Sequence, residues 1–169
     1  MWLAVWPADV GADCHTASTD TVSIGGAGIT VTGGADVVAA KTLTIGADVS
    51  STANTVFSAG DDLSIAADID TGAGDLSLSA GSAITQLAGR IATASLHTDS
   101  GGATTLNQPT NAIARFAATT TAGNVSLTNS VALDVGTSDV GGDLHIANTD
   151  TVSIGGAGIT ATGGADGVA

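Results

Sequence analysis

Short alternations of apolar and polar residues recur along the chain. The segment Asp-Thr-Val-Ser-Ile at 20–24 is echoed by Lys-Thr-Leu-Thr-Ile at 41–45 and by Asp-Leu-Ser-Ile at 62–65. Apolar residues take every second position, which is the period of a β-strand. We therefore expect Val22 and Ile24 to point to one side and the residues between them to the other. Glycine, Asp or Asn bounds each segment, which predicts short strands and tight turns.

The alternating segments recur at a nearly constant distance. One apolar position repeats once in each such step, at Ile24, Ile45, Ile65, Ile84, Leu106, Leu127 and Ile146. Short strands, glycine-rich corners and a fixed coil length are typical of a solenoid. We predict an all-β chain folded as a right-handed parallel β-helix with about 20–22 residues per coil, in which each strand pairs with its equivalent one coil away.

A longer repeat contains the short one. Residues 19–30 return without change at 149–160, and residues 1–39 match residues 131–169 at 27 of 39 positions. The 130-residue offset predicts a module of six coils, and the chain, 1–169, is expected to be a single β-helix segment of a longer array. The copies diverge at the module edge, where Trp2, Trp6 and Pro7 stand opposite Ala132, Gly136 and Thr137.

The composition agrees with a thin β core. The chain has 24 glycines, two Trp, two Phe and no Tyr, and its 16 acidic residues are all Asp. Residues that favour helix interiors are scarce apart from Ala and Leu. Small apolar side chains suit a narrow stacked core better than a thick globular one. A β-sandwich fits a long repeat less well, and a membrane β-barrel needs longer strands and aromatic girdles.

The charge excludes two classes of partner. The net charge is −13, and the cations are Lys41, Arg90 and Arg115. Phosphate backbones and anionic lipid headgroups would be repelled, so nucleic-acid binding is not expected. The negative charge is better explained as a means of keeping a β-rich repeat protein soluble. The N-terminal segment lacks the basic and apolar regions of a signal peptide.

Two equivalent histidines are candidate metal ligands. His15 and His145 each lie two residues after an Asp. Cys14 is the one neighbouring residue that could also bind a metal, but it aligns with Leu144, so a buried apolar cysteine is the favoured interpretation. A single cysteine also excludes an intrachain disulfide. His97 is expected on the surface.

The densest acidic group is Asp61, Asp62, Asp68 and Asp70, which resembles a set of Ca²⁺ ligands. The segment 25–30 nearly has the Gly-Gly-x-Gly-x-Asp pattern of calcium-binding β-rolls, but Thr30 replaces the Asp. The favoured explanation of this acidic group is that its aspartates lie in turns, where they are solvated or accept hydrogen bonds from backbone amides. We predict no metal site and no cofactor.

No catalytic motif is present. The glycine clusters lack the third glycine of a dinucleotide fingerprint and the Gly-Lys-Ser/Thr of a P-loop, and no Gly-x-Ser-x-Gly elbow occurs. We therefore predict no catalytic or cofactor-binding residues, and that the protein is not an enzyme. Thr-x-Thr pairs such as Thr42/Thr44 resemble ice-binding arrays, but Asp, Ser and His in equivalent positions are expected to break the array.

The segment 81–135 has a familiar sequence pattern. It contains Gly-Ser-Ala-Ile-Thr-Gln at 81–86, Gly-Arg-Ile-Ala-Thr-Ala-Ser-Leu at 89–96 and Gly-Asn-Val-Ser-Leu-Thr-Asn at 123–129. This pattern resembles the repetitive shaft of filamentous-haemagglutinin-type adhesins and the repeats of autotransporter passenger domains. The resemblance implies a right-handed β-helix, export through an outer-membrane pore in Gram-negative bacteria, and a secreted or surface-attached rod in adhesion, aggregation or biofilm formation.

Three hypotheses of function follow. The first is the shaft segment of such an adhesin, whose polar outer face contacts glycans or proteins on host or bacterial surfaces. The second is a structural β-helix protein that associates end to end through unpaired strands. The third is an ice-binding β-helix.

Overall fold

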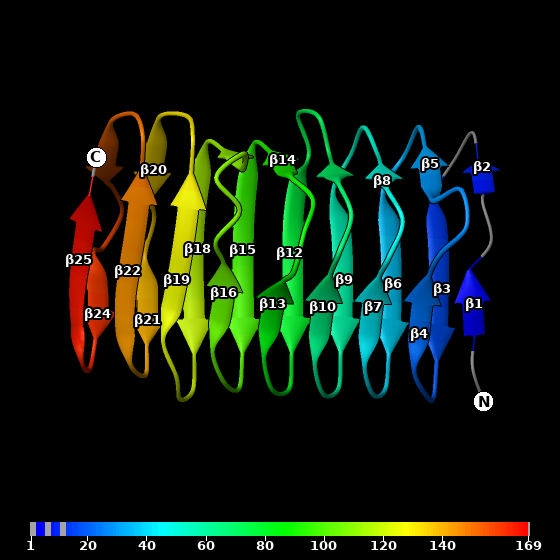
Figure 1. The fold of residues 1–169 in the computed structure, drawn as a ribbon, viewed down its shortest axis with the longest axis horizontal. Helices are drawn as coiled ribbons and strands as arrows, with labels where there is room; N and C mark the ends of the chain where they lie inside the picture. The colour runs from blue at the N-terminus through cyan, green and yellow to red at the C-terminus, as the bar shows by residue number, and fades with distance from the viewer. Residues whose placement is uncertain (1–2, 6–7, 11–12, 169) are drawn as a thin grey trace.

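The computed structural model describes residues 3–5, 8–10 and 13–168, which form twenty-five β-strands and no helix. The strands belong to three parallel sheets, here called A, B and C (Figure 1). Trp2, Trp6 and Pro7, at the expected edge of the repeat, lie outside the described residues.

From β1 to β18 the chain passes through sheets A, B and C in turn, and from β19 to β25 it passes only through sheets A and C. Sheet A contains β1 (Leu3–Val5), β4 (Val22–Ile24), β7 (Leu43–Ile45), β10 (Leu63–Ile65), β13 (Ile84–Gln86), β16 (Thr104–Leu106), β19 (Val125–Asn129), β22 (Asp143–Asn148) and β25 (Gly164–Val168). Sheet B contains β2 (Ala8–Val10), β5 (Ile29–Val31), β8 (Val49–Ser50), β11 (Ile69–Asp70), β14 (Ile91–Thr93) and β17 (Ala112–Ile113). Sheet C contains β3 (Cys14–Ser18), β6 (Ala35–Ala39), β9 (Thr55–Ala59), β12 (Asp75–Ala80), β15 (Ser95–Ser100), β18 (Arg115–Thr120), β20 (Leu133–Val135), β21 (Ser138–Val140), β23 (Val152–Ile154) and β24 (Ile159–Ala161).

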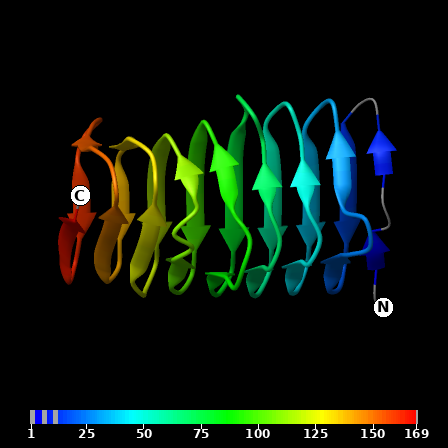
Figure 2. The same ribbon diagram turned by 45° about the horizontal axis from the view of Figure 1, so that its top comes forward.

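The coil is flattened and has two broad faces. In Figure 1 the strands of sheets A and B point upward and those of sheet C point downward, so sheets A and B form one face and sheet C forms the other. The chain ends lie at opposite ends of the stack, and Figure 2 shows the coils following one another in a single row. At about 4.8 Å per coil, eight coils give a rod about 40 Å long.

The parallel β-helix prediction is confirmed. Neighbouring strands in the described part of the chain are parallel, and Val22 is followed in its row by Leu43, Leu63 and Ile84, one residue from each successive coil. Val22 and Ile24 are fully buried, as their alternation predicts, and Ser23 between them faces outward. Apolar side chains from all three sheets fill one continuous core.

One predicted apolar row is wrong at a single position. Ile84 does not follow Ile65 but pairs with Leu63, and Gln86 pairs with Ile65 instead. The sequence pattern favoured the apolar residue, whereas Gln86 is buried because its side-chain amide has partners inside the coil. Its Nε2 donates to the carbonyl oxygen of Gly89 and to Oδ1 of Asn111, both at 2.9 Å.

The 130-residue repeat is close to the six coils predicted, but it is not a whole number of coils. Six coils lead from Val22 to Leu144, so Val152, the repeat partner of Val22, lies eight residues further along the coil. As a result Val22 belongs to sheet A, whereas Val152 belongs to β23 in sheet C. The 130-residue repeat therefore contains six coils and a part of a seventh.

A tight corner connects sheet C to sheet A. A Cβ atom added to Gly81 would overlap the carbonyl oxygen of Gly60 in the preceding coil, and one added to Gly101 would overlap the carbonyl oxygen of Gly81. The coils approach here because the Gly81 amide donates to the carbonyl oxygen of Ala59 at 3.0 Å. Only glycine leaves room for this contact.

We expect Gly81→Ala to lower the free energy of unfolding by about 1–3 kcal/mol, because the new methyl group must push two backbones apart. Urea unfolding followed by circular dichroism would measure the change. Gly25→Ala is the matched control: nothing lies within 4 Å of its added Cβ, so we expect no loss of stability and a gain of up to about 1 kcal/mol. Equal losses in the two variants would contradict the tight corner.

Candidate functional site

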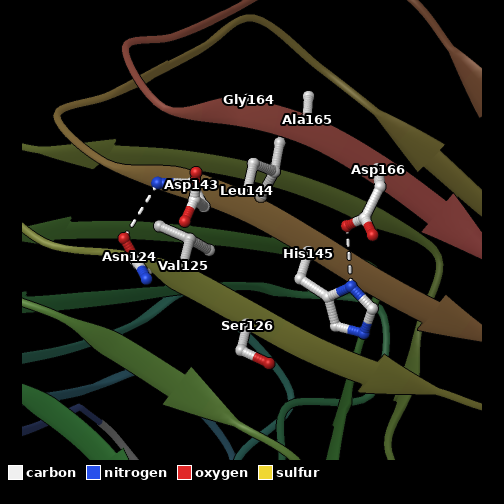
Figure 3. A pocket seen from close by; sticks show the side chains of 9 residues that line it. All are labelled: Asn124, Val125, Ser126, Asp143, Leu144, His145, Gly164, Ala165 and Asp166. Carbon is white, nitrogen blue, oxygen red and sulfur yellow. Dashed lines mark hydrogen bonds and ion pairs between the residues drawn. The ribbon is translucent and has the colours of Figure 1, made fainter.

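Two equivalent Asp–His pairs lie in shallow hollows on the surface of the described residues. His15 lies on β3 and Asp36 directly beside it on β6, and His145 and Asp166 have the same relation on β22 and β25. The alternation of each strand turns these side chains outward. The Nδ1 atom of the imidazole lies 2.9 Å from Oδ2 of Asp36 in the first hollow and 2.7 Å from Oδ1 of Asp166 in the second (Figure 3).

The same repeat positions line both hollows. Asp13, Cys14, His15, Gly34, Ala35 and Asp36 line the first, and their equivalents in the second copy of the long repeat line the second. The sequence identified the Asp-x-His motif but missed Asp36 and Asp166. The signal was available, because each of these aspartates follows its histidine by one coil.

A second aspartate holds the rim of the first hollow. Oδ1 of Asp13 accepts a hydrogen bond from the Gly34 amide at 2.9 Å, so it connects two coils through the backbone. At the second hollow the amide of Asp143 donates to Oδ1 of Asn124 at 2.9 Å (Figure 3). Cys14 is half-buried and packs against the core, in agreement with the apolar interpretation.

No lysine or arginine that the structure describes pairs with the aspartates of the two hollows. Each lysine and arginine side chain instead has an aspartate partner elsewhere. Nζ of Lys41 lies 3.2 Å from Oδ1 of Asp20. Nη2 of Arg90 lies 3.4 Å from Oδ2 of Asp70, and Nε of Arg115 lies 3.9 Å from Oδ2 of Asp134. The histidines are well exposed, with 68% of the His15 side chain and 48% of the His145 side chain accessible. An exposed Asp–His pair contributes at most about 1 kcal/mol to the free energy of unfolding.

The aspartates of the expected acidic group are separated in the structure. Asp62 accepts the amide of Ala83 at 3.1 Å, and Asp68 accepts the amide of Arg90 at 2.7 Å, at two different corners of the coil. Asp70 accepts the amide of Gly72 at 2.9 Å. The turn-capping interpretation is therefore confirmed for these three aspartates. Among residues 3–5, 8–10 and 13–168, no group of three or more His, Cys, Asp or Glu residues is arranged to hold a metal ion.

A straight row of hydroxyl groups runs along sheet A. The central outward residue of each strand is Ser or Thr in six consecutive coils, namely Ser23, Thr44, Ser64, Thr85, Thr105 and Ser126. His145 and Asp166 continue the row. The expectation that Asp, Ser and His break the array of threonine pairs is confirmed, although the central row keeps a hydroxyl group in six consecutive coils. The adjacent outward positions are mixed, with Thr42 beside Thr44 but Asp62 beside Ser64.

Histidine geometry gives no support for nucleophilic catalysis. A catalytic base must reach the hydroxyl or thiol that it activates, whereas His15 and His145 form their side-chain hydrogen bonds with carboxylates.

His97 is exposed on the outer side of β15, as predicted. No helix in the described part of the chain is long and apolar enough to span a membrane.

The chain was compared with known proteins at three levels. It matches no protein-family model, and neither a curated protein nor a solved structure is significantly similar to it. The stacked coils and their outward side chains are therefore the observations from which a function can be argued.

Proposed function

We propose that this chain is a repetitive shaft segment of a secreted or surface-attached bacterial adhesin. The observation that carries the proposal is the uninterrupted stack of coils over a repeated sequence, with short polar side chains along its outer faces. A repeated surface offers many equivalent weak contacts, and multivalency converts weak contacts into firm attachment. The resemblance to haemagglutinin-type repeats supports the same assignment.

The core makes the shaft stiff. Each strand between two others is hydrogen-bonded on both sides, and the apolar rows run through adjacent coils. Stiffness matters for a multivalent shaft, because a rigid array fixes the spacing of its contacts at about 4.8 Å per coil. The proposed ligands are glycans or proteins on host or bacterial surfaces, and nucleic acid is disfavoured by the net charge of −13.

The test of adhesion is binding by beads that carry the folded chain at graded densities. We expect attachment to bacterial or host cells to rise more steeply than the density, as multivalent contacts require. Beads with the same amount of heat-unfolded chain are the control. Attachment no greater than that of the unfolded control at every density would remove the adhesin proposal.

The proposed location has its own test. A secreted or surface-attached segment should be accessible to antibody and to added protease on intact cells, and it should be found with the surface or culture fluid after fractionation. Recovery of the chain only from the interior of broken cells would contradict the location.

The hydroxyl row on sheet A favours a second candidate, an ice-binding protein. Regularly spaced hydroxyl groups along a flat sheet can order water, and the row from Ser23 to Ser126 supplies one group per coil. We expect this candidate to show thermal hysteresis, to lose it in Thr85→Lys, and to keep it in His97→Lys on sheet C. Absence of thermal hysteresis in the folded chain would eliminate this function.

A further inference from the structure

Equivalent positions of the long repeat lie on opposite broad faces of the rod. His15 faces outward from sheet C, and His145, with the same position in the second copy, faces outward from sheet A. The connection between these sheets reverses the direction of the chain, as the upward and downward strands in Figure 1 show. The two Asp–His hollows therefore face away from each other.

The strand lengths change sides in the same way. In the first copy the long strands β3 and β6, of five residues each, lie in sheet C, and the three-residue strands β4 and β5 lie in sheets A and B. In the second copy the long strands β22 and β25, of six and five residues, lie in sheet A, and the three-residue strands β23 and β24 lie in sheet C. The repeat thus carries its whole pattern of strands to the opposite face.

We infer that the long repeat makes the chain a two-sided bridge, in which its two copies, 1–39 and 131–169, offer the same outward groups to two opposing partner surfaces. A repeat of whole coils would place every copy on one face, and all contacts would then be made with a single surface. The offset of eight residues beyond six coils prevents this. The inference rests on the proposed function for the identity of the surfaces, and its geometry can be tested without any natural ligand.

Disulfide cross-linking tests the offset itself. His145 is paired with Ser126 of sheet A, whereas an in-phase repeat would place it beside Ala117, the last residue of the sheet C row that contains His15 and His97. Neighbouring strands lie about 4.8 Å apart, which is within the range of Cα separations that a disulfide spans. Cys14→Leu removes the native thiol and introduces the residue that the second copy has at this position.

In that background, Ser126→Cys with His145→Cys is expected to form an intramolecular disulfide on mild oxidation, detected by mass spectrometry and gel mobility. Ala117→Cys with His145→Cys is the matched control and is expected to remain reduced. Cross-linking of the control pair, or of neither pair in the folded protein, would overturn the inferred offset.

Bead agglutination tests the bridge. In a variant with His15→Cys and His145→Cys, biotin is attached to the two new cysteines through a short linker, so the two biotin groups lie on opposite faces. We expect this variant to agglutinate streptavidin-coated beads. Biotin at His15→Cys and His97→Cys lies on one face, four coils apart, and is expected to agglutinate the beads at least several-fold less. Equal agglutination by the two proteins would overturn the two-sided display. Because the readout uses biotin, failure of the adhesin proposal would leave this result unchanged.

Discussion

Phe57→Ala is expected to lower the free energy of unfolding by about 3–5 kcal/mol, the usual cost of removing a large buried aromatic side chain. Phe57 is fully buried, and it lies in its row between Val37 of the preceding coil and Leu78 of the next. Those neighbours are held by the hydrogen bonds of sheet C, so they cannot move together to fill the cavity. Urea unfolding monitored by circular dichroism would measure the loss.

Val56→Ala is the control for this prediction. Val56 precedes Phe57 in the same strand, but its side chain faces outward and is 38% exposed. We expect it to change the stability by no more than about 0.5 kcal/mol. Similar losses in the two variants would mean that Phe57 does not point into the core.

Asn111→Ala is expected to cost about 2–4 kcal/mol, because it leaves several buried polar groups without partners. Asn111 is fully buried. Its Oδ1 accepts hydrogen bonds from Nε2 of Gln86 and from the amide of Ile91, both at 2.9 Å. Its Nδ2 donates to Oε1 of Gln86 at 2.9 Å and to the carbonyl oxygens of Leu106 and Thr128. One side chain thus joins parts of the chain from three coils.

Asn107→Ala is the matched control, because Asn107 is exposed and accepts one hydrogen bond, from the Ser126 hydroxyl at 2.8 Å. A double variant, Gln86→Ala with Asn111→Ala, should lose less stability than the sum of the single variants, since the two side chains satisfy each other. Additive losses would show that the reciprocal pair does not form. Chemical denaturation of the four variants supplies all the values.

Some of the candidate surface could have been found from the sequence. The Asp-x-His motif of the two hollows was visible, and moving one coil along the chain from each histidine would have added Asp36 and Asp166. The hydroxyl row was harder to find because Ser and Thr are common at outward strand positions. Only the register shows that Ser64 and Thr85 stand side by side in one straight row.

The sequence by itself determined the class of fold and the inward or outward direction of most side chains. Strict alternation, as in Val22-Ser23-Ile24, fixes which residues enter the core because successive side chains of a strand point to opposite sides. Gln86 could not be placed in this way, because a polar side chain enters the core only where other buried groups satisfy it.

The tertiary structure alone decided on which face each strand lies. Residues 19–30 and 149–160 are identical, yet the first copy crosses sheets A and B and the second lies in sheet C. Local sequence cannot distinguish these placements, since each strand needs only an apolar inner side and a parallel neighbour. The face depends on the summed length of all the coils between the copies, and the chain reaches residue 152 with eight residues more than six coils require.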